Sequence, residues 1–99
     1  MRWADLKAGT FVRGSAEDFY QVDGGWTPKE IADYEPIFDF EGRILYVTQR
    51  KIVIDGWWRW VLDEKYTAED PQETRGTFGI LRRGIDVLQV LDNGPVVDL

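Results

Sequence analysis

The sequence predicts a mainly β fold, a small bent antiparallel sheet or a partly open barrel, accompanied by one short helix. Short apolar runs rich in β-branched and aromatic side chains alternate with turn dipeptides along most of the chain. With 99 residues, of which 43% are hydrophobic and 30% charged, the chain has the length of one domain and the composition of a protein with a buried core. We therefore expect a single β-rich domain over residues 1–99.

The predicted strands are short, and together they would form a barrel of about the size of an SH3 or OB domain. Residues that tolerate positive φ follow several strands, and tight turns require such residues. The strongest of these turn signals is Asp55-Gly56, which predicts a hairpin that pairs Ile54 with Trp57. The other predicted turns are Asp23-Gly24, Glu41-Gly42 and Asn93-Gly94. In chain order, the predicted strands are Thr10 to Arg13, Asp18 to Val22, Ile37 to Glu41, Arg43 to Thr48, Lys51 to Asp55, Trp57 to Leu62, Thr77 to Arg82 and Ile85 to Leu91.

The helix is predicted from Pro28 to Tyr34, where it would close one end of the sheet. Thr27 and Glu30 have the spacing of a capping box, and proline suits the first helical position. Trp26 and Ile31 have the spacing of a hydrophobic staple. Pro36 disfavours helical geometry just before it, so the helix must be short. A polar loop with one helical turn is expected from Glu64 to Arg75.

The absence of cysteine and histidine excludes several kinds of chemistry. Zinc fingers, disulfides, thiol nucleophiles and Ser-His-Asp relays all need one of these residue types. Carboxylate pairs exist, but every acidic protein offers them, so we expect no enzyme activity, no cofactor and no metal site. The charged first residues and the absence of a long apolar run predict a cytoplasmic protein with no membrane segment.

Three tryptophans and an arginine crowd one predicted strand: Trp57, Trp58, Arg59 and Trp60. Because side chains alternate along a strand, Trp57 shares a face with Arg59, and Trp58 shares the opposite face with Trp60. Core packing accounts for such residues in many proteins. A strand that is apolar on both faces is nevertheless difficult to bury in so small a domain, and Trp and Arg dominate protein interfaces. We therefore treat these four residues as candidate partner-binding residues.

Charge is distributed unevenly along the chain, whose formal net charge is -6. Residues 17–41 hold eight acidic side chains against one lysine, whereas residues 42–62 are basic. The acidic stretch is either a solvated face that maintains solubility or a surface that attracts a basic partner. On the second interpretation, the candidate partner-binding carboxylates are Glu30, Asp33, Glu35, Asp39 and Glu41.

The segment Leu6 to Arg13, followed by Glu17-Asp18-Phe19-Tyr20 and Asp23-Gly24-Gly25-Trp26, resembles the opening hairpin of short orphan proteins of actinobacterial phages. The resemblance covers about a quarter of the chain. Ser15-Ala16 stands where an Asp-Gly turn is often found in those proteins. They share no activity that would transfer to this chain, so the resemblance implies a phage gene product and no particular chemistry.

Together these features predict a non-catalytic protein-binding module. If the resemblance holds, it would be a phage-encoded acidic inhibitor or modulator of a host protein in the bacterial cytoplasm. The alternative is a structural or assembly subunit, such as a virion protein or a homodimer, whose second apolar face is covered by an identical chain. Below these stands the binding of single-stranded nucleic acid or sugar on the tryptophan hairpin, and the net charge argues against nucleic acid.

Overall fold

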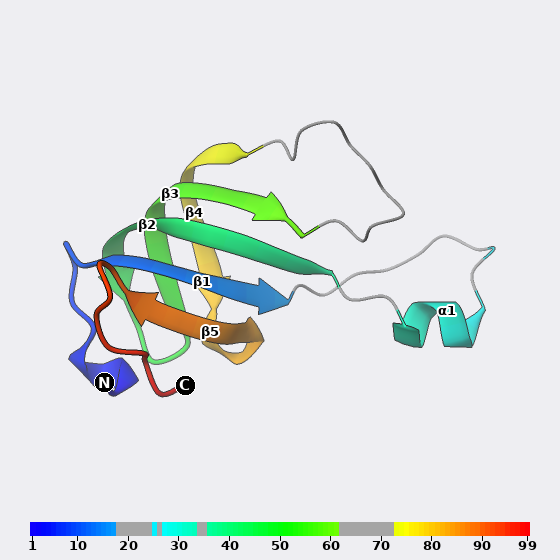
Figure 1. Ribbon diagram of the computed structural model, residues 1–99, viewed down its shortest axis with the longest axis horizontal. Helices are drawn as coiled ribbons and strands as arrows, with labels where there is room; N and C mark the ends of the chain where they lie inside the picture. The colour runs from blue at the N-terminus through cyan, green and yellow to red at the C-terminus, as the bar shows by residue number, and fades with distance from the viewer. Residues whose placement is uncertain (18–24, 26, 34–35, 62–72) are drawn as a thin grey trace.

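The chain forms a strongly curved antiparallel sheet, as predicted (Figure 1). The computed structural model describes residues 1–17, 25, 27–33, 36–61 and 73–99. These residues form a five-stranded sheet in the order β4-β3-β2-β1-β5, and every neighbouring pair is antiparallel. The strands are β1 (Phe11–Glu17), β2 (Ile37–Val47), β3 (Lys51–Trp60), β4 (Thr74–Leu81) and β5 (Ile85–Val90). The predicted strand Asp18 to Val22 lies outside the described residues.

Two predicted turns are wrong, because Glu41-Gly42 lies inside β2 and Asp55-Gly56 lies inside β3. Ile54 therefore pairs with Ile44 of β2 rather than with Trp57. The reason lies in the register, which places Gly42 directly opposite Gly56. A Cβ on Gly56 would come within 2.6 Å of the Cα of Gly42, closer than real Cβ atoms approach. These glycines serve a close approach of two strands and not a reversal of the chain.

The turn between β2 and β3 instead lies at Gln49 and Arg50. Thr48 holds it, because its backbone N–H donates to the carbonyl of Lys51 at 2.9 Å. Its hydroxyl oxygen also accepts hydrogen bonds from the backbone N–H groups of Arg50 and Lys51, at 3.2 and 3.1 Å. A threonine side chain can thus organise a tight turn without glycine.

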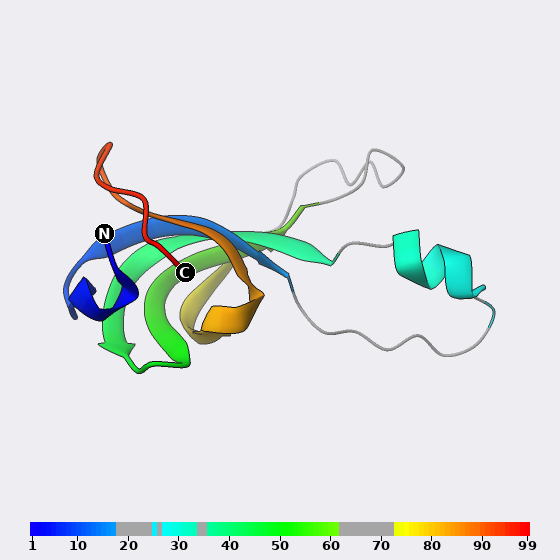
Figure 2. The ribbon, with the colours of Figure 1, turned by 90° about the horizontal axis from the view of Figure 1, so that it is seen from below.

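The sheet curls until its two edges approach each other at one end. The strands β4 and β5 occupy opposite edges, yet only the 3₁₀ turn η2 (Arg82–Gly84) joins them. Gly42, Gly56 and Gly76 form a row across three strands, and their lack of side chains permits a sharp bend there. Figure 2 shows the resulting curvature of β2, β3 and β4. The architecture is a strongly bent open sheet, the first of the two predicted forms.

The core fills the concave face of this sheet. Val12, Ile44, Ile52, Ile54 and Leu88 are fully buried there. The 3₁₀ turn η1 (Trp3–Asp5) closes the end of the core near the β2–β3 turn, where Trp3 donates its indole N–H to the carbonyl of Thr48 at 2.8 Å. We call this part of the concave face the closed end. The remaining buried members of the core are Leu6, Ala16, Phe40, Ile80, Ile85 and Val97.

The helix α1 (Pro28–Asp33) begins as predicted. The backbone N–H of Glu30 donates to the hydroxyl of Thr27 at 3.1 Å, and the N–H of Thr27 donates to the Glu30 carboxylate at 3.2 Å. The expectation that this helix closes one end of the sheet is wrong, since its residues are all exposed and it lies well beyond the strands (Figure 1). Trp26, Tyr34 and most of the predicted polar loop, residues 64–72, lie outside the described residues.

The chain ends beside its own beginning. The predicted turn Asn93-Gly94 is confirmed, because Asn93 has φ 58° and the N–H of Gly94 donates to Val90 at 3.0 Å. The segment after it returns along β5, with a bridge between Gln89 and Val96. Within the described part of the chain, no helix combines the length and apolarity needed to span a bilayer.

Candidate functional site

Four aromatic rings gather at the end of the concave face opposite η1, which we call the open end. They come from three strands: Phe38 from β2, Trp58 and Trp60 from β3, and Phe78 from β4. The rings of Trp58 and Trp60 meet edge to face, with centroids 5.5 Å apart. Phe38 contacts both indoles in the same way, at 6.1 and 5.8 Å. Edge-to-face contacts of this kind stabilise an aromatic cluster beyond the area it buries.

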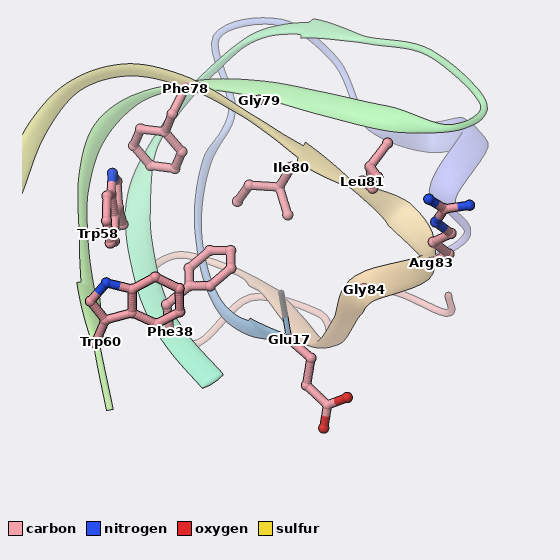
Figure 3. Close-up of a pocket in the computed structure, with 10 residues that line it drawn as sticks. All are labelled: Glu17, Phe38, Trp58, Trp60, Phe78, Gly79, Ile80, Leu81, Arg83 and Gly84. Atoms are coloured by element: carbon pink, nitrogen blue, oxygen red, sulfur yellow. The ribbon is translucent and has the colours of Figure 1, made fainter. Parts of the chain in front are cut away.

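These rings form one wall of a cavity of about 410 Å³, which we call the aromatic cavity (Figure 3). Ile80 lies at its base, and the opposite wall comes from Glu17, Arg83 and Gly84. The cavity opens to solvent, and 40% of the surface of Trp60 is exposed. Leu81, which also lines the cavity, is exposed as well. The open end therefore presents apolar surface that this chain does not cover in the described residues.

The aromatic cavity borders a sheet edge. Among the described residues, β4 pairs only with β3, so its second side carries backbone groups that no strand engages. A Cβ built on Gly76 or Gly79 would meet no atom within 4 Å, which shows open space over this strand. The other edge of the sheet differs, because the N–H of Val97 donates to Leu88 of β5 at 2.8 Å. The C-terminal segment thus covers part of β5, and no described segment covers the outer edge of β4.

The convex face holds the other tryptophan of β3. The guanidinium of Arg59 lies over the ring of Trp57 at 5.5 Å from its centroid, as the predicted alternation requires. Glu41 lies opposite Trp57 in the register, and Arg13 approaches its carboxylate at 3.8 Å. Asp39 lies opposite Arg59. A shallow cleft of about 500 Å³ runs between these side chains, and its charges alternate in sign.

The candidate carboxylates that the structure describes do not form one acidic surface. Asp39 and Glu41 lie on the sheet beside arginines, whereas Glu30 and Asp33 lie on α1. Asp33 also pairs with Lys29 at 2.8 Å. Glu35 lies outside the described residues. The described candidate carboxylates are therefore divided between the sheet and α1.

The candidate tryptophans are divided as well. Trp58 and Trp60 face the aromatic cavity, and Trp57 and Arg59 face the convex cleft. Of the basic side chains in residues 42–62, Arg59 lies beside Trp57, whereas Arg50 and Lys51 lie at the closed end of the sheet. Arg13 and Arg59 thus line the convex cleft with Trp57, whereas Trp58 and Trp60 face the aromatic cavity.

Sequence reasoning missed Phe38, Phe78, Glu17 and Arg83 as neighbours of the tryptophans. Phe38 is separated from Trp60 by more than twenty residues of sequence, and only the β2–β3 register places them opposite each other. The alternation of Phe38 with Phe40 was the available signal, because it indicates a strand whose large side chains share one face. Nothing local predicted the approach of Glu17 to η2.

The fold and this cavity define a small mainly β domain in which, over the described residues, an apolar hollow lies uncovered beside an unpaired sheet edge. Among the described residues, no three acidic side chains gather closely enough to hold a metal ion. No protein-family model, curated protein or solved structure matches this chain. Its function must therefore be inferred from the geometry of the site itself.

Proposed function

We propose that this protein is a non-catalytic protein-binding module whose partner occupies the aromatic cavity. The observation that carries the proposal is the arrangement of Phe38, Trp58, Trp60 and Phe78 around a solvent-open hollow of about 410 Å³. Tryptophan rings that line a pocket are the side chains on which protein interfaces most depend. The cavity has apolar walls, which suit the binding of an apolar side chain, and the charged residues Glu17 and Arg83 lie on its border.

The partner is a host protein if the phage resemblance of the N-terminal segment is meaningful, and binding then inhibits or redirects that protein. A net charge of -6 favours partners with a basic surface, because opposite fields raise the rate of encounter. Such a role needs no chemistry from the small protein. It requires only that the aromatic cavity be filled by something outside this chain.

Affinity capture with matched variants tests this proposal. The immobilised protein, Trp60→Ala and Trp57→Ala are each incubated with an actinobacterial lysate, and bound proteins are quantified by mass spectrometry. Trp60 and Trp57 lie on the same strand but face opposite sides of the sheet, so they form a matched pair. We expect a specific partner to be retained by the Trp57 variant and lost by the Trp60 variant. Equal capture by all three proteins would contradict the proposal.

A structural subunit is the second candidate, and exposed apolar side chains on the outside of the molecule favour it. Phe11 is 55% exposed and Tyr46 is 65% exposed. Large aromatic side chains that are exposed to this extent can mark a protein interface. In this role, a second copy of the chain covers these residues. Sedimentation equilibrium at micromolar concentration distinguishes the candidates. Self-association that Phe11→Ser and Tyr46→Ser abolish would support the subunit, and a monomer would exclude it.

A further inference from the structure

We infer that the partner contributes an extended segment that adds to the free edge of β4 as a further strand. One of its apolar side chains fills the aromatic cavity, and a neighbouring basic side chain meets Glu17. This inference rests on the proposed function and specifies the kind of partner that the aromatic cavity binds.

The backbone of β4 is the first reason. In an antiparallel sheet, alternate residues of an edge strand direct their N–H and C=O groups away from the sheet, where another strand can pair with them. The outer side of β5 is partly occupied, since it bridges to Val96 and accepts the N–H of Val97. Among the described residues, β4 has no such cover. The two edges of the sheet are thus not equivalent, and only β4 offers an open row of backbone groups beside the aromatic cavity.

The side chains of β4 are the second reason. Phe78 and Ile80 point into the aromatic cavity, as Figure 3 shows, while Gly76 and Gly79 have open space around them. Glycine in an edge strand allows another backbone to approach closely. An added strand would direct every second side chain toward the concave face, beside Phe78 and Trp60. Backbone pairing and filling of the cavity therefore occur in the same binding pose.

Charge selects the occupant. Glu17 is exposed at the rim, and no ion pair engages it among the described residues. The guanidinium of Arg83 extends to the other side of Gly84, away from the Glu17 carboxylate (Figure 3). A second copy of this chain would bring another -6 of charge to the interface, which opposes pairing of two β4 edges. In a segment from a different protein, an apolar residue can fill the cavity, and a lysine or arginine next to it can form an ion pair with Glu17.

Selection from a library of random nine-residue peptides against the intact protein tests this inference. We expect the enriched peptides to alternate apolar and polar residues and to favour Lys and Arg over Asp and Glu. The best peptide is then synthesised in two forms. One form is N-methylated at the amides of its odd-numbered residues and the other at those of its even-numbered residues, and we call these two sets of amides the two phases. In an added strand, one phase donates to β4 and the other faces solvent. Methylation should therefore abolish binding in one phase and leave it within about twofold in the other.

Variants of the protein sharpen the result. Trp60→Ala should weaken binding of the peptide by at least about tenfold, the effect expected of an anchoring aromatic residue. Trp57→Ala on the opposite face should change it by less than about twofold, within the range of near-neutral positions. Glu17→Gln should remove the preference for basic peptides. No enriched peptide, or equal effects of both N-methylated forms, would overturn strand addition.

The two proposals fail in different ways. If the lysate partner still depends on Trp60 but no peptide is selected, or N-methylation has equal effects in both phases, strand addition is wrong and protein binding through the aromatic cavity stands. If Trp60→Ala changes neither the lysate partner nor the selected peptides, both proposals are wrong.

Discussion

The closed end and the open end of the concave face each hold a tryptophan, and the two rings have opposite environments. At the closed end, Trp3 is 4% exposed, donates its indole N–H to Thr48 and lies under the guanidinium of Arg82 at 4.9 Å. At the open end, Trp60 is 40% exposed and its ring packs edge to face against Phe38 and Trp58. Within the described residues, Trp3 thus fills one end of the concave face, whereas the other end holds an open cavity.

The difference lies in what the chain supplies to each end. The N-terminal turn η1 and the C-terminal segment meet beside the closed end. The backbones of Arg2 and Asp98 form a β-bridge there, and Trp3 enters the core. Among the described residues, no corresponding segment enters the aromatic cavity. We therefore expect the closed end to determine stability and the open end to determine binding.

The largest effect should come from Trp3→Ala, because it removes a buried ring and leaves a cavity in the closed end. We expect a loss of about 3 to 5 kcal/mol in the free energy of unfolding, measured by urea denaturation. Trp3→Phe should recover most of this loss, with about 1 kcal/mol remaining for the missing N–H donor. A loss below about 1 kcal/mol for Trp3→Ala would show that this ring does not hold the closed end together.

The bend between the two ends depends on the glycine pair, so Gly56→Ala is the next most damaging change. Its methyl group would lie against Gly42 of the neighbouring strand, where no flexible side chain can move aside. We expect a loss of about 1 to 3 kcal/mol, typical of overpacking. Gly79→Ala is the matched control, since its Cβ meets nothing within 4 Å, and it should be near neutral. Equal effects of the two changes would contradict the role of the glycine pair.

At the open end, Trp60→Ala should cost about 1.5 kcal/mol in the free energy of unfolding, because it loses edge-to-face contacts and the burial of a ring that is already 40% exposed. The loss in the free energy of unfolding should therefore be at least about twofold larger for Trp3→Ala than for Trp60→Ala, as measured in the same urea titrations. If Trp60→Ala destabilised the fold as much as Trp3→Ala, the aromatic cluster would belong to the core. The separation of stability from binding would then be lost.

The smallest effect should come from Arg82→Gln, which removes the cation from above Trp3. An interaction of this kind at a partly exposed site contributes about 0.5 to 1 kcal/mol. Arg83→Gln, on the neighbouring exposed residue, should change stability by less than about 0.5 kcal/mol. Thermal melts of the two variants side by side provide the measurement. Indistinguishable melting temperatures would show that Arg82 does not support the closed end.

Features that depend on neighbouring residues were predictable. The capping box of Thr27 and Glu30 starts α1 where the spacing predicts, because its hydrogen bonds span only one turn. The separation of Trp57 from Trp58 follows equally from the alternation of a strand. The mainly β class follows from the same local patterns of apolar runs and turn residues.

Features that depend on register were not predictable in this way. Asp55-Gly56 has the residues of a tight turn, yet Gly42 stands opposite it and makes the same glycine part of a bend. Thr48, not a glycine, organises the true turn. Local chemistry permits both outcomes, and the pairing of distant strands selects between them.

The sequence by itself determined that this chain forms a small β-rich fold, where its helix begins and which tryptophans share a face, because these properties arise within a few residues of backbone. Only the tertiary structure decided that Trp3 closes one end while Phe38, Trp60 and Phe78 surround a cavity at the other. The cavity joins residues of β1, β2, β3, β4 and η2 that meet through register and curvature, and neither property can be read from any short stretch of the chain.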